Sequence, residues 1–279
     1  MIKIVTDTTA NLSGEILARY DIRQVPIAIQ FGLESYEEDV DIDRDMFYRK
    51  IEEMGIVPTT SQPATGRFTD VYRTLAAAGH DILSIHVTSK HSGTYQSAIL
   101  ASSLVPHARV EVFDSASISL GTGYMVLEAA QAAEKGWSVE QILDRLRQVR
   151  DRMHLFLTPA TLKYLQMSGR VGKLQSALAS LIQLKPIIRL EDGLLEACEN
   201  VRTRVRALDR LVELLVEAVG THDLVNVAVV HARAAQEGRE LLERLKTTLN
   251  CCEIMFDELV ASLAVHGGPG VVGVFVYRQ

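Results

Sequence analysis

The sequence predicts an α/β fold with two domains, on the basis of three patterns in its 279 residues. Short apolar strands alternate with helices through the first half, and such βαβ units build a parallel sheet that is covered on both faces. The second half adds a hairpin signal at Asp192-Gly193, which favours a mixed sheet. The length also suffices for two domains of ordinary size. We therefore expect an N-terminal three-layer parallel-sheet domain (residues 1–153) and a C-terminal two-layer domain with a mixed sheet (154–279).

In the first half, turn and cap residues divide the chain into regular elements. Asp43 is a preferred helix N-cap, Gly79 ends a helix, and Ser138-Val-Glu-Gln141 is a capping-box pattern. The expected strands cover residues 2–5, 25–31, 82–87 and 110–113. The expected helices cover residues 13–20, 43–54, 66–78, a stretch from Ser92 onward, 121–134 and 138–150.

In the second half, the same reasoning predicts more strands. They cover residues 154–157, 186–190, 194–198, 226–231, 252–256 and 271–277. Helices are expected over residues 162–166, 175–182, 206–219 and 236–247.

The composition indicates a cytoplasmic protein. Hydrophobic residues make up 47% and charged residues 23%, as in ordinary folded soluble proteins. The net charge of −6 gives a nucleic-acid partner no electrostatic help. Cys198, Cys251 and Cys252 have no metal-ligand spacing, and their odd number fits a reducing compartment. We find no apolar run of about 18 residues and no signal peptide, so at most transient membrane contact is expected.

Ser92 stands at the junction between the strand predicted over residues 82–87 and the helix after it. We expect it to be the N-cap of that helix, because a serine hydroxyl accepts a backbone N–H that is unpaired in the first turn. Such N–H groups and the helix dipole also attract anions. Ligands of open α/β sheets bind beyond the carboxyl ends of the strands, where this loop is expected. A plain cap and an anion site both fit the residues.

Three more polar segments belong to the same hypothesis. Residues 59–63, Thr-Thr-Ser-Gln-Pro, are expected to be a loop, because Pro63 disfavours a helical Gln62. Its hydroxyls either donate to a carboxylate or phosphate or cap the next helix. Asp114-Ser115 and residues 6–9 each follow an apolar strand. In a parallel sheet they reach the same edge as the Ser92 loop.

Basic side chains supply further candidates. His266 precedes Gly-Gly-Pro-Gly270 and either donates to an anion, acts as a general base, or is exposed on a turn. Arg170, in Ser168-Gly-Arg, fits a helix C-cap or a bidentate anion clamp. A solvated helix face or a surface for an acidic partner both fit the cluster Arg202, Arg204, Arg206 and Arg210.

The familiar signatures of nucleotide binding and serine hydrolysis are missing. Ser92, Asp114 and His266 do follow the Ser–Asp–His order of hydrolases, but any long chain offers such triples. A serine hydrolase that acts on acyl esters through Ser92 and His266 is therefore the alternative to a non-catalytic binding protein.

Taken together, the motifs resemble the DegV family along essentially the whole chain. In order they are Thr60-Ser-Gln-Pro63, Ser92-Gly-Thr-Tyr-Gln-Ser97, Asp114-Ser115, Ser168-Gly-Arg170, Leu184-Lys-Pro186, Val201-Arg-Thr-Arg204 and His266-x-Gly268-Pro-Gly270. Each motif alone is weak, whereas the ordered set is specific. Gly267 departs from the family, in which a hydroxyl residue is common at this position.

The resemblance implies a carrier without catalytic activity or cofactor. DegV proteins bind a long-chain fatty acid such as palmitate, stearate or oleate between two domains. Some of them, the FakB proteins, present it to a kinase related to dihydroxyacetone kinases, which forms an acyl phosphate. The implied carboxylate ligands are Thr60 and Ser92, with His266 nearby.

The chemistry of a fatty acid agrees with the residues, because the head needs hydroxyls and a helix N-terminus, and the tail needs an apolar tunnel. The ligand-binding residues that we predict are Thr60, Ser61, Ser92, Gly93, Thr94 and His266. The arginines that we expect to dock the kinase are Arg170, Arg202 and Arg204.

Overall fold

The computed structural model describes residues 1–170 and 184–279, so the helix predicted over residues 175–182 lies outside the described part. The chain divides into two compact units. The N-terminal unit contains Met1–Arg150 and Val260–Ser262, and the C-terminal unit contains Asp151–Leu259 and Leu263–Gln279. The sequence-based division at residue 153 stays a prediction.

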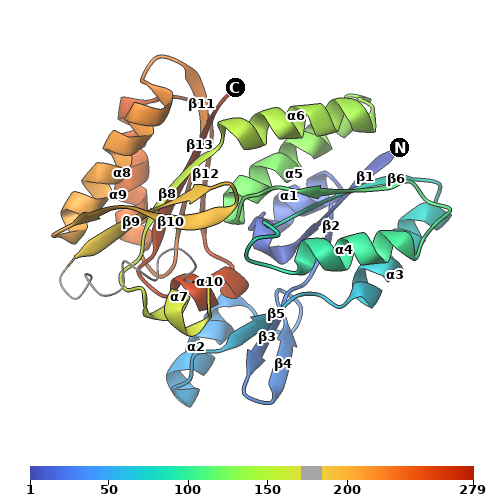
Figure 1. Cartoon of the computed structure of the whole chain (residues 1–279), viewed down its shortest axis with the longest axis horizontal. Coiled ribbons are helices and arrows are strands. Elements are labelled where there is room, and N and C mark those ends of the chain that lie inside the picture. Colours follow the sequence, from blue (N-terminus) through green and yellow to red (C-terminus); the bar gives the residue numbers. More distant parts are fainter. Residues whose placement is uncertain (171–183) are drawn as a thin grey trace. The chain divides into compact units, whose positions relative to one another are not determined.

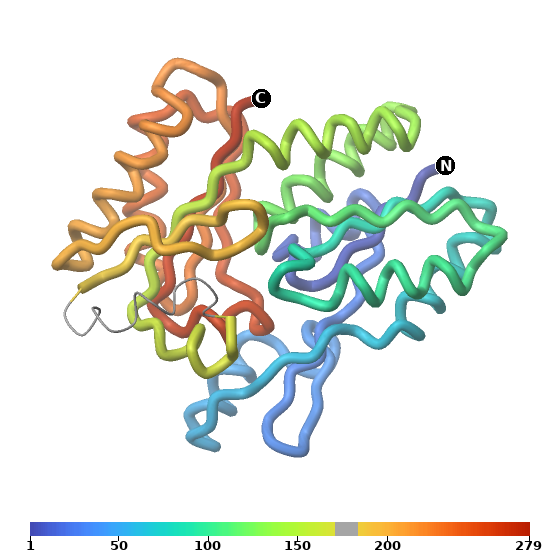
Figure 2. Tube along the Cα trace, viewed as in Figure 1, coloured from blue at the N-terminus to red at the C-terminus, as the bar shows by residue number. Residues whose placement is uncertain are grey.

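The N-terminal unit is built on a parallel sheet of four strands in the order β2-β1-β6-β7. The strands are β1 (Ile2–Asp7), β2 (Arg23–Val25), β6 (Asp81–His86) and β7 (Val110–Asp114). Figure 2 shows how β1 and β6 come side by side although most of the first hundred residues separate them in the chain. All three pairings are parallel, so the carboxyl ends of the strands share one edge.

Helices cover both faces of this sheet. On one face, α3 (Thr65–Ala77) and α4 (Thr94–Ser103) bury Phe68, Tyr72 and Ala98 against the strands. On the other lie α5 (Ser119–Glu134) and α6 (Val139–Arg152) (Figure 1). The capping box is confirmed, since the Ser138 N–H donates to Gln141 Oε1 (2.9 Å) and the Gln141 N–H to Ser138 Oγ (3.3 Å). The helical turn η1 (Thr8–Ala10) and α1 (Gly14–Arg19) follow β1.

A small antiparallel sheet in the same unit corrects two expectations. Its order is β4-β3-β5, with β3 (Ala28–Phe31), β4 (Glu34–Glu37) and β5 (Thr59–Ser61), and helix α2 (Arg44–Met54) follows β4. A single strand over residues 25–31 is wrong, because Pro26 has no N–H to continue the ladder and the chain changes sheets there. The loop expected at residues 59–63 is also wrong in its first part, because β5 pairs with β3.

The C-terminal unit has a mixed sheet of six strands in the order β10-β9-β8-β13-β11-β12. Their bounds are β8 His154–Thr158, β9 Lys185–Glu191, β10 Leu194–Val201, β11 Leu224–His231, β12 Asn250–Glu258 and β13 Val272–Arg278. Among the described strands of this sheet, only β11 and β12 pair in parallel. Its core joins the strands to α8 (Arg204–Val219) and α9 (Ala235–Thr248), which lie side by side on the sheet (Figure 1).

The hairpin between β9 and β10 is confirmed. Asp192 and Gly193 both have positive φ (49° and 76°), as a two-residue turn of type I′ requires. The short helices α7 (Lys163–Met167) and α10 (Ala261–Gly267) complete the described elements. No described helix combines the length and the apolar composition of a membrane span. The predicted fold class, a parallel sheet followed by a mixed one, is therefore confirmed.

Candidate functional site

Polar loops meet at the carboxyl edge of the parallel sheet, as the topology requires. The loops after β6 and β7 are tied to each other, because the Thr88 N–H donates to the Ser117 carbonyl (2.8 Å) and the Ser89 N–H to Asp114 Oδ1 (3.2 Å). The Ser115 N–H also reaches back to the His86 carbonyl (3.0 Å). This edge is where open α/β sheets bind their ligands.

Ser92 lies at this edge but is not the helix cap. Helix α4 starts at Thr94, and its cap is Gly93, whose carbonyl accepts the Ser97 N–H at 2.9 Å. The predicted N-cap is therefore wrong by one residue. The Ser92 hydroxyl instead accepts the Thr94 N–H (3.2 Å) and forms a hydrogen bond with Thr94 Oγ1 (2.8 Å). Ser92 and Gly93 are half-buried and Thr94 is buried, so the hydroxyl of Ser92 stays partly accessible.

Gln62 brings the two hydroxyl-bearing motifs together. Its Nε2 donates to Ser97 Oγ in α4 at 3.0 Å. Its carboxamide covers Gly93 so closely that a Cβ added there would lie 1.8 Å from Gln62 Oε1. The end of β5, with the half-buried Thr60 and Ser61, is thus held against the start of α4. The sequence did not predict this contact, because Gln62 was noted for its position before a proline and as part of the Thr60-Ser-Gln-Pro63 motif, and neither indicates a partner.

Asp114 is the last residue of β7, and its carboxylate holds the loop that follows. Its Oδ1 accepts the Ala116 N–H (2.9 Å), and both of its carboxylate oxygens accept the Ser89 N–H. Ser115, which is fully buried, forms a hydrogen bond with Thr122 Oγ1 (2.9 Å). These bonds fix the loop after β7, and the carboxylate of Asp114 holds the backbone of Ser89 and Ala116 in place.

His266 lies in the last turn of α10, in the segment assigned to the C-terminal unit. The turn after it is fixed by packing, because Gly268 has φ +73° and a Cβ there would lie 2.1 Å from the ring of Tyr164. The Gly270 N–H donates to the Ala232 carbonyl at 2.6 Å. The structure thus has a rigid turn here, with His266 on a helix rather than in the turn itself.

Arg204 is committed to contacts inside the C-terminal unit. Its guanidinium donates to Glu237 Oε2 (2.7 Å), the Thr158 carbonyl (2.9 Å) and the Gly270 carbonyl (2.8 Å). Its side chain is only 20% exposed. Arg204 therefore ties the start of α8 to α9, to the end of β8 and to the turn after His266.

The other two candidate docking arginines differ from Arg204. Arg170 donates to the Ser168 carbonyl at 2.7 Å, as expected for an arginine that closes the C-terminus of α7. Arg202 is exposed and has no ion pair with residues 1–170 or 184–279. Of Arg170, Arg202 and Arg204, only Arg202 is exposed.

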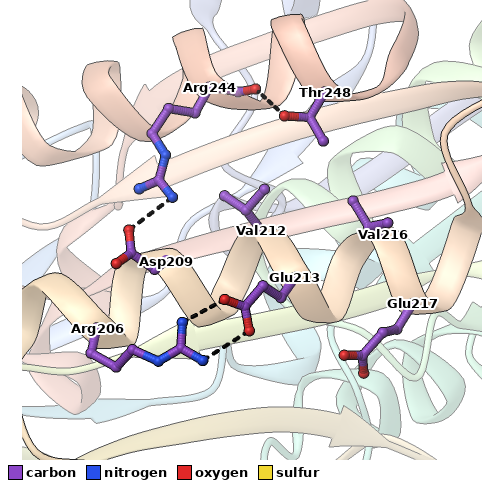
Figure 3. Close-up of a pocket in the computed structure, with 8 residues that line it drawn as sticks. All are labelled: Arg206, Asp209, Val212, Glu213, Val216, Glu217, Arg244 and Thr248. Carbon is purple, nitrogen blue, oxygen red and sulfur yellow. Dashed lines mark hydrogen bonds and ion pairs between the residues drawn. The ribbon is translucent and has the colours of Figure 1, made fainter.

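A shallow hollow of about 500 Å³ lies between α8 and α9 (Figure 3). Arg206 pairs there with Glu213, and Arg244 with Asp209 at 2.9 Å. The apolar side chains shown between them are Val212 and Val216. With Glu217, the lining has three carboxylates and two guanidinium groups, so the hollow has no surplus positive charge that would favour a carboxylate.

Comparison with known proteins gives one family. The family model described as "Uncharacterised protein, DegV family" matches residues 1–279. A DegV domain-containing protein of Halalkalibacterium halodurans is 33% identical over 279 residues, covering 100% of this chain and 99% of that one.

Solved structures agree in fold. A fatty-acid-binding DegV family protein from Thermus thermophilus has a TM-score of 0.94 and 32% identity, covering 100% of this chain and 99% of that one. A stearic-acid-binding protein from Eubacterium ventriosum has a TM-score of 0.91 and 29% identity, covering 100% and 98%.

Proposed function

Because the chain belongs to the DegV family along its whole length, we propose that it binds a long-chain fatty acid and has no catalytic step of its own. Structural neighbours that cover the whole chain are fatty-acid-binding proteins, one of them a stearic-acid-binding protein. The observation that carries the proposal for this chain is the contact of Gln62 with Gly93 and Ser97, because it joins the Thr60 and Ser92 segments.

The head group is the part of the ligand that the N-terminal unit suits. Thr60 and Ser92 are half-buried hydroxyls on segments that Gln62 holds together, and a hydroxyl can donate to a carboxylate. Ser92 precedes a helix of ten residues, whose N-terminal N–H groups favour an anion. In this proposal Thr60 and Ser92 donate to the carboxylate, while Ser61, Gly93 and Thr94 shape the loop around it.

The tail supplies most of the binding energy. Burial of each CH₂ contributes roughly 0.8 kcal/mol, so a chain of palmitate or stearate length is held tightly without a covalent bond. Such a tail requires an apolar tunnel, as ligand pockets usually provide.

The test is native mass spectrometry of the purified protein, before and after loading with palmitate, stearate or oleate. Wild-type protein is expected to retain one acid, and Thr60→Ala/Ser92→Ala to stay folded and retain none. The matched control is Thr59→Ala/Ser89→Ala, which removes two exposed hydroxyls from the same strand and loop. Normal retention by Thr60→Ala/Ser92→Ala would show that these hydroxyls do not hold the acid. Ester hydrolysis that is lost in Ser92→Ala would favour the hydrolase instead.

We propose further that the bound acid is presented to a separate kinase of the dihydroxyacetone-kinase type. The net charge is −6, so an exposed arginine without an ion pair among the described residues is a local reversal of sign. Such a reversal steers an acidic or nucleotide-carrying partner and acts mainly on the association rate. Arg202 fulfils this condition, and Arg204 does not.

The kinase proposal is tested with acid-loaded protein at two ionic strengths. Arg202→Glu is expected to keep acid binding and to slow acyl-phosphate formation, more so at low salt. Arg49→Glu, on the exposed face of α2, is the control for the same change in net charge. Equal rates for both variants at both salt concentrations would remove Arg202 from the docking surface. His266→Ala is tested in the loading assay, where a loss of acid retention is expected.

A further inference from the structure

A chain of four polar side chains runs through the core of the N-terminal unit. Tyr72 of α3 donates to Ser84 Oγ (2.7 Å), Ser84 Oγ lies 2.7 Å from His86 Nε2, and His86 Nδ1 lies 2.8 Å from Asp7 Oδ2. All four side chains have 0% exposure. Buried polar groups destabilise a core unless every partner is satisfied, so a complete chain of this kind restricts the fold to one arrangement.

The hydrogen bonds of the chain have one consistent direction. Burial raises the pKa of Tyr72, so its hydroxyl stays protonated and donates a hydrogen bond to Ser84 Oγ. The hydroxyl of Ser84 can then donate to His86 Nε2, which leaves a proton on His86 Nδ1 to be donated to Asp7. The ring of Phe68 packs edge-on against His86, with centroids 5.0 Å apart, and keeps the imidazole in place.

The hydrogen-bonded side chains of Ser84, His86 and Asp7 have the order of a Ser–His–Asp triad, but a substrate has no access to them. Ser84 has 0% exposure and its oxygen already accepts the Tyr72 proton, so no substrate reaches it in this arrangement. Any effect of the chain on function must therefore pass through other groups.

Those groups are the first residues of two loops at the carboxyl edge. Asp7 Oδ1 accepts the Thr9 N–H (3.0 Å) and the Thr9 hydroxyl, after β1. Asp7 Oδ2 accepts the Val87 N–H at 3.5 Å, directly after β6. Val87 begins the loop that leads to Ser92, and the next N–H, that of Thr88, is held by the Ser117 carbonyl. Asp7 thus connects the buried side chains of Tyr72, Ser84 and His86 to the loop of the proposed carboxylate site, through its hydrogen bond with the Val87 N–H.

We propose that Tyr72, Ser84, His86 and Asp7 are a positioning network that fixes the loop over residues 87–93 and thereby sets the affinity for the ligand carboxylate. Its consequence for ligand binding rests on the proposed function, whereas its effect on the loop does not. None of the four residues contacts the ligand in this proposal.

Amide hydrogen exchange and acid affinity together test the network. Asp7→Asn and His86→Phe are expected to speed exchange at residues 87–94 at least tenfold, with little change at Leu83 and Ile85 inside β6. Stearate affinity is expected to fall by a similar factor. Tyr72→Phe, which removes only the first hydrogen bond, is the milder variant if the others fold poorly. His86→Gln, which can both donate and accept, is expected to restore part of the protection.

The control is Leu75→Ala, which destabilises the same core from α3 but removes none of the hydrogen bonds that join Tyr72, Ser84, His86 and Asp7. The network is refuted if the loop exchanges as in the wild type in Asp7→Asn, His86→Phe and Tyr72→Phe, or if Leu75→Ala loosens it equally. A wild-type protein that binds no acid would instead refute the proposed function. The exchange measurement would still show whether Asp7 holds the loop. An Nδ1–H signal of His86 in nitrogen-resolved NMR that disappears in Asp7→Asn would support the network.

Discussion

At the scale of single residues, Gln62 connects the two segments of the proposed carboxylate site. We expect Gln62→Ala to weaken acid binding more than it weakens the fold, because one hydrogen bond to Ser97 is worth only about 1 kcal/mol of stability. A fluorescent fatty-acid displacement assay and urea unfolding measure the two effects. Gln96→Ala, exposed on α4, is the control. Unchanged affinity in Gln62→Ala would separate Gln62 from the site.

Glu38 makes the N-terminal unit sensitive to pH. It is 1% exposed, and its carboxylate accepts the N–H and the hydroxyl of Ser262, each at 2.6 Å. Burial raises the pKa of Glu38 to about 7, although the hydrogen bonds from Ser262 and Thr8 oppose the rise. In an unfolded chain the group titrates near its ordinary value of 4.5.

The folded protein therefore binds more protons than the unfolded chain between these two pKa values. The stability from neutral Glu38 is complete below about pH 4.5 and is lost as the pH rises through about 7. Glu38→Gln imitates the protonated group at every pH, so we expect it to match the wild type near pH 5 and to be more stable near pH 8. Denaturant unfolding at both pH values measures this, with exposed Glu52→Gln as the control. A difference between variant and wild type that is independent of pH would contradict it.

The buried residues of the N-terminal unit show what a sequence does not reveal. His86 stands in an apolar run and Asp7 in a hydroxyl-rich loop, and nothing local indicates that they meet. Their contact depends on the parallel pairing of β1 with β6, which only the fold establishes. Thr60 and Ser92 each lie in a polar motif beside a predicted element, but it is the resemblance to the DegV family that selects their hydroxyls.

At the scale of secondary-structure elements, Arg204 holds the turn after His266 to three other parts of the C-terminal unit. Arg204→Ala leaves Glu237 and the carbonyls of Thr158 and Gly270 without this donor. Because the side chain is partly exposed, we expect a loss of about 1–3 kcal/mol of unfolding free energy. Arg206→Ala, which breaks the exposed pair with Glu213, is expected to cost less than about 1 kcal/mol. Equal losses of unfolding free energy in Arg204→Ala and Arg206→Ala would show that the contacts of Arg204 stabilise the unit no more than an exposed ion pair does.

Elements with local signals were predicted well, and elements that depend on distant partners were not. The capping box at Ser138 and the turn at Asp192-Gly193 depend only on residues close together in the sequence, and both are confirmed. Strand β4, Glu34–Glu37, carries no apolar alternation, and β5 is three residues long. Both form because β3 supplies a hydrogen-bonding edge to each of them, and that edge is not visible in the sequence around them.

At the scale of the whole molecule, acid binding must appear as added stability. A ligand that binds only the folded protein stabilises it by mass action, by about 2.7 kcal/mol at a hundred times its dissociation constant. We expect delipidated protein to melt at a lower temperature than stearate-loaded protein, and the Thr60→Ala/Ser92→Ala variant to show little shift.

Methyl stearate separates the contribution of the head from that of the tail. It keeps the tail but cannot present a carboxylate, so its affinity should be lower by about 1–3 kcal/mol, the cost of losing hydrogen bonds to a charged group. In the Thr60→Ala/Ser92→Ala variant, neither the acid nor the ester should raise the melting temperature much, because the donors are already gone. If the acid and the ester raised the melting temperature of the wild type equally, the hydroxyls of Thr60 and Ser92 would not bind the carboxylate, and binding would depend on the tail alone.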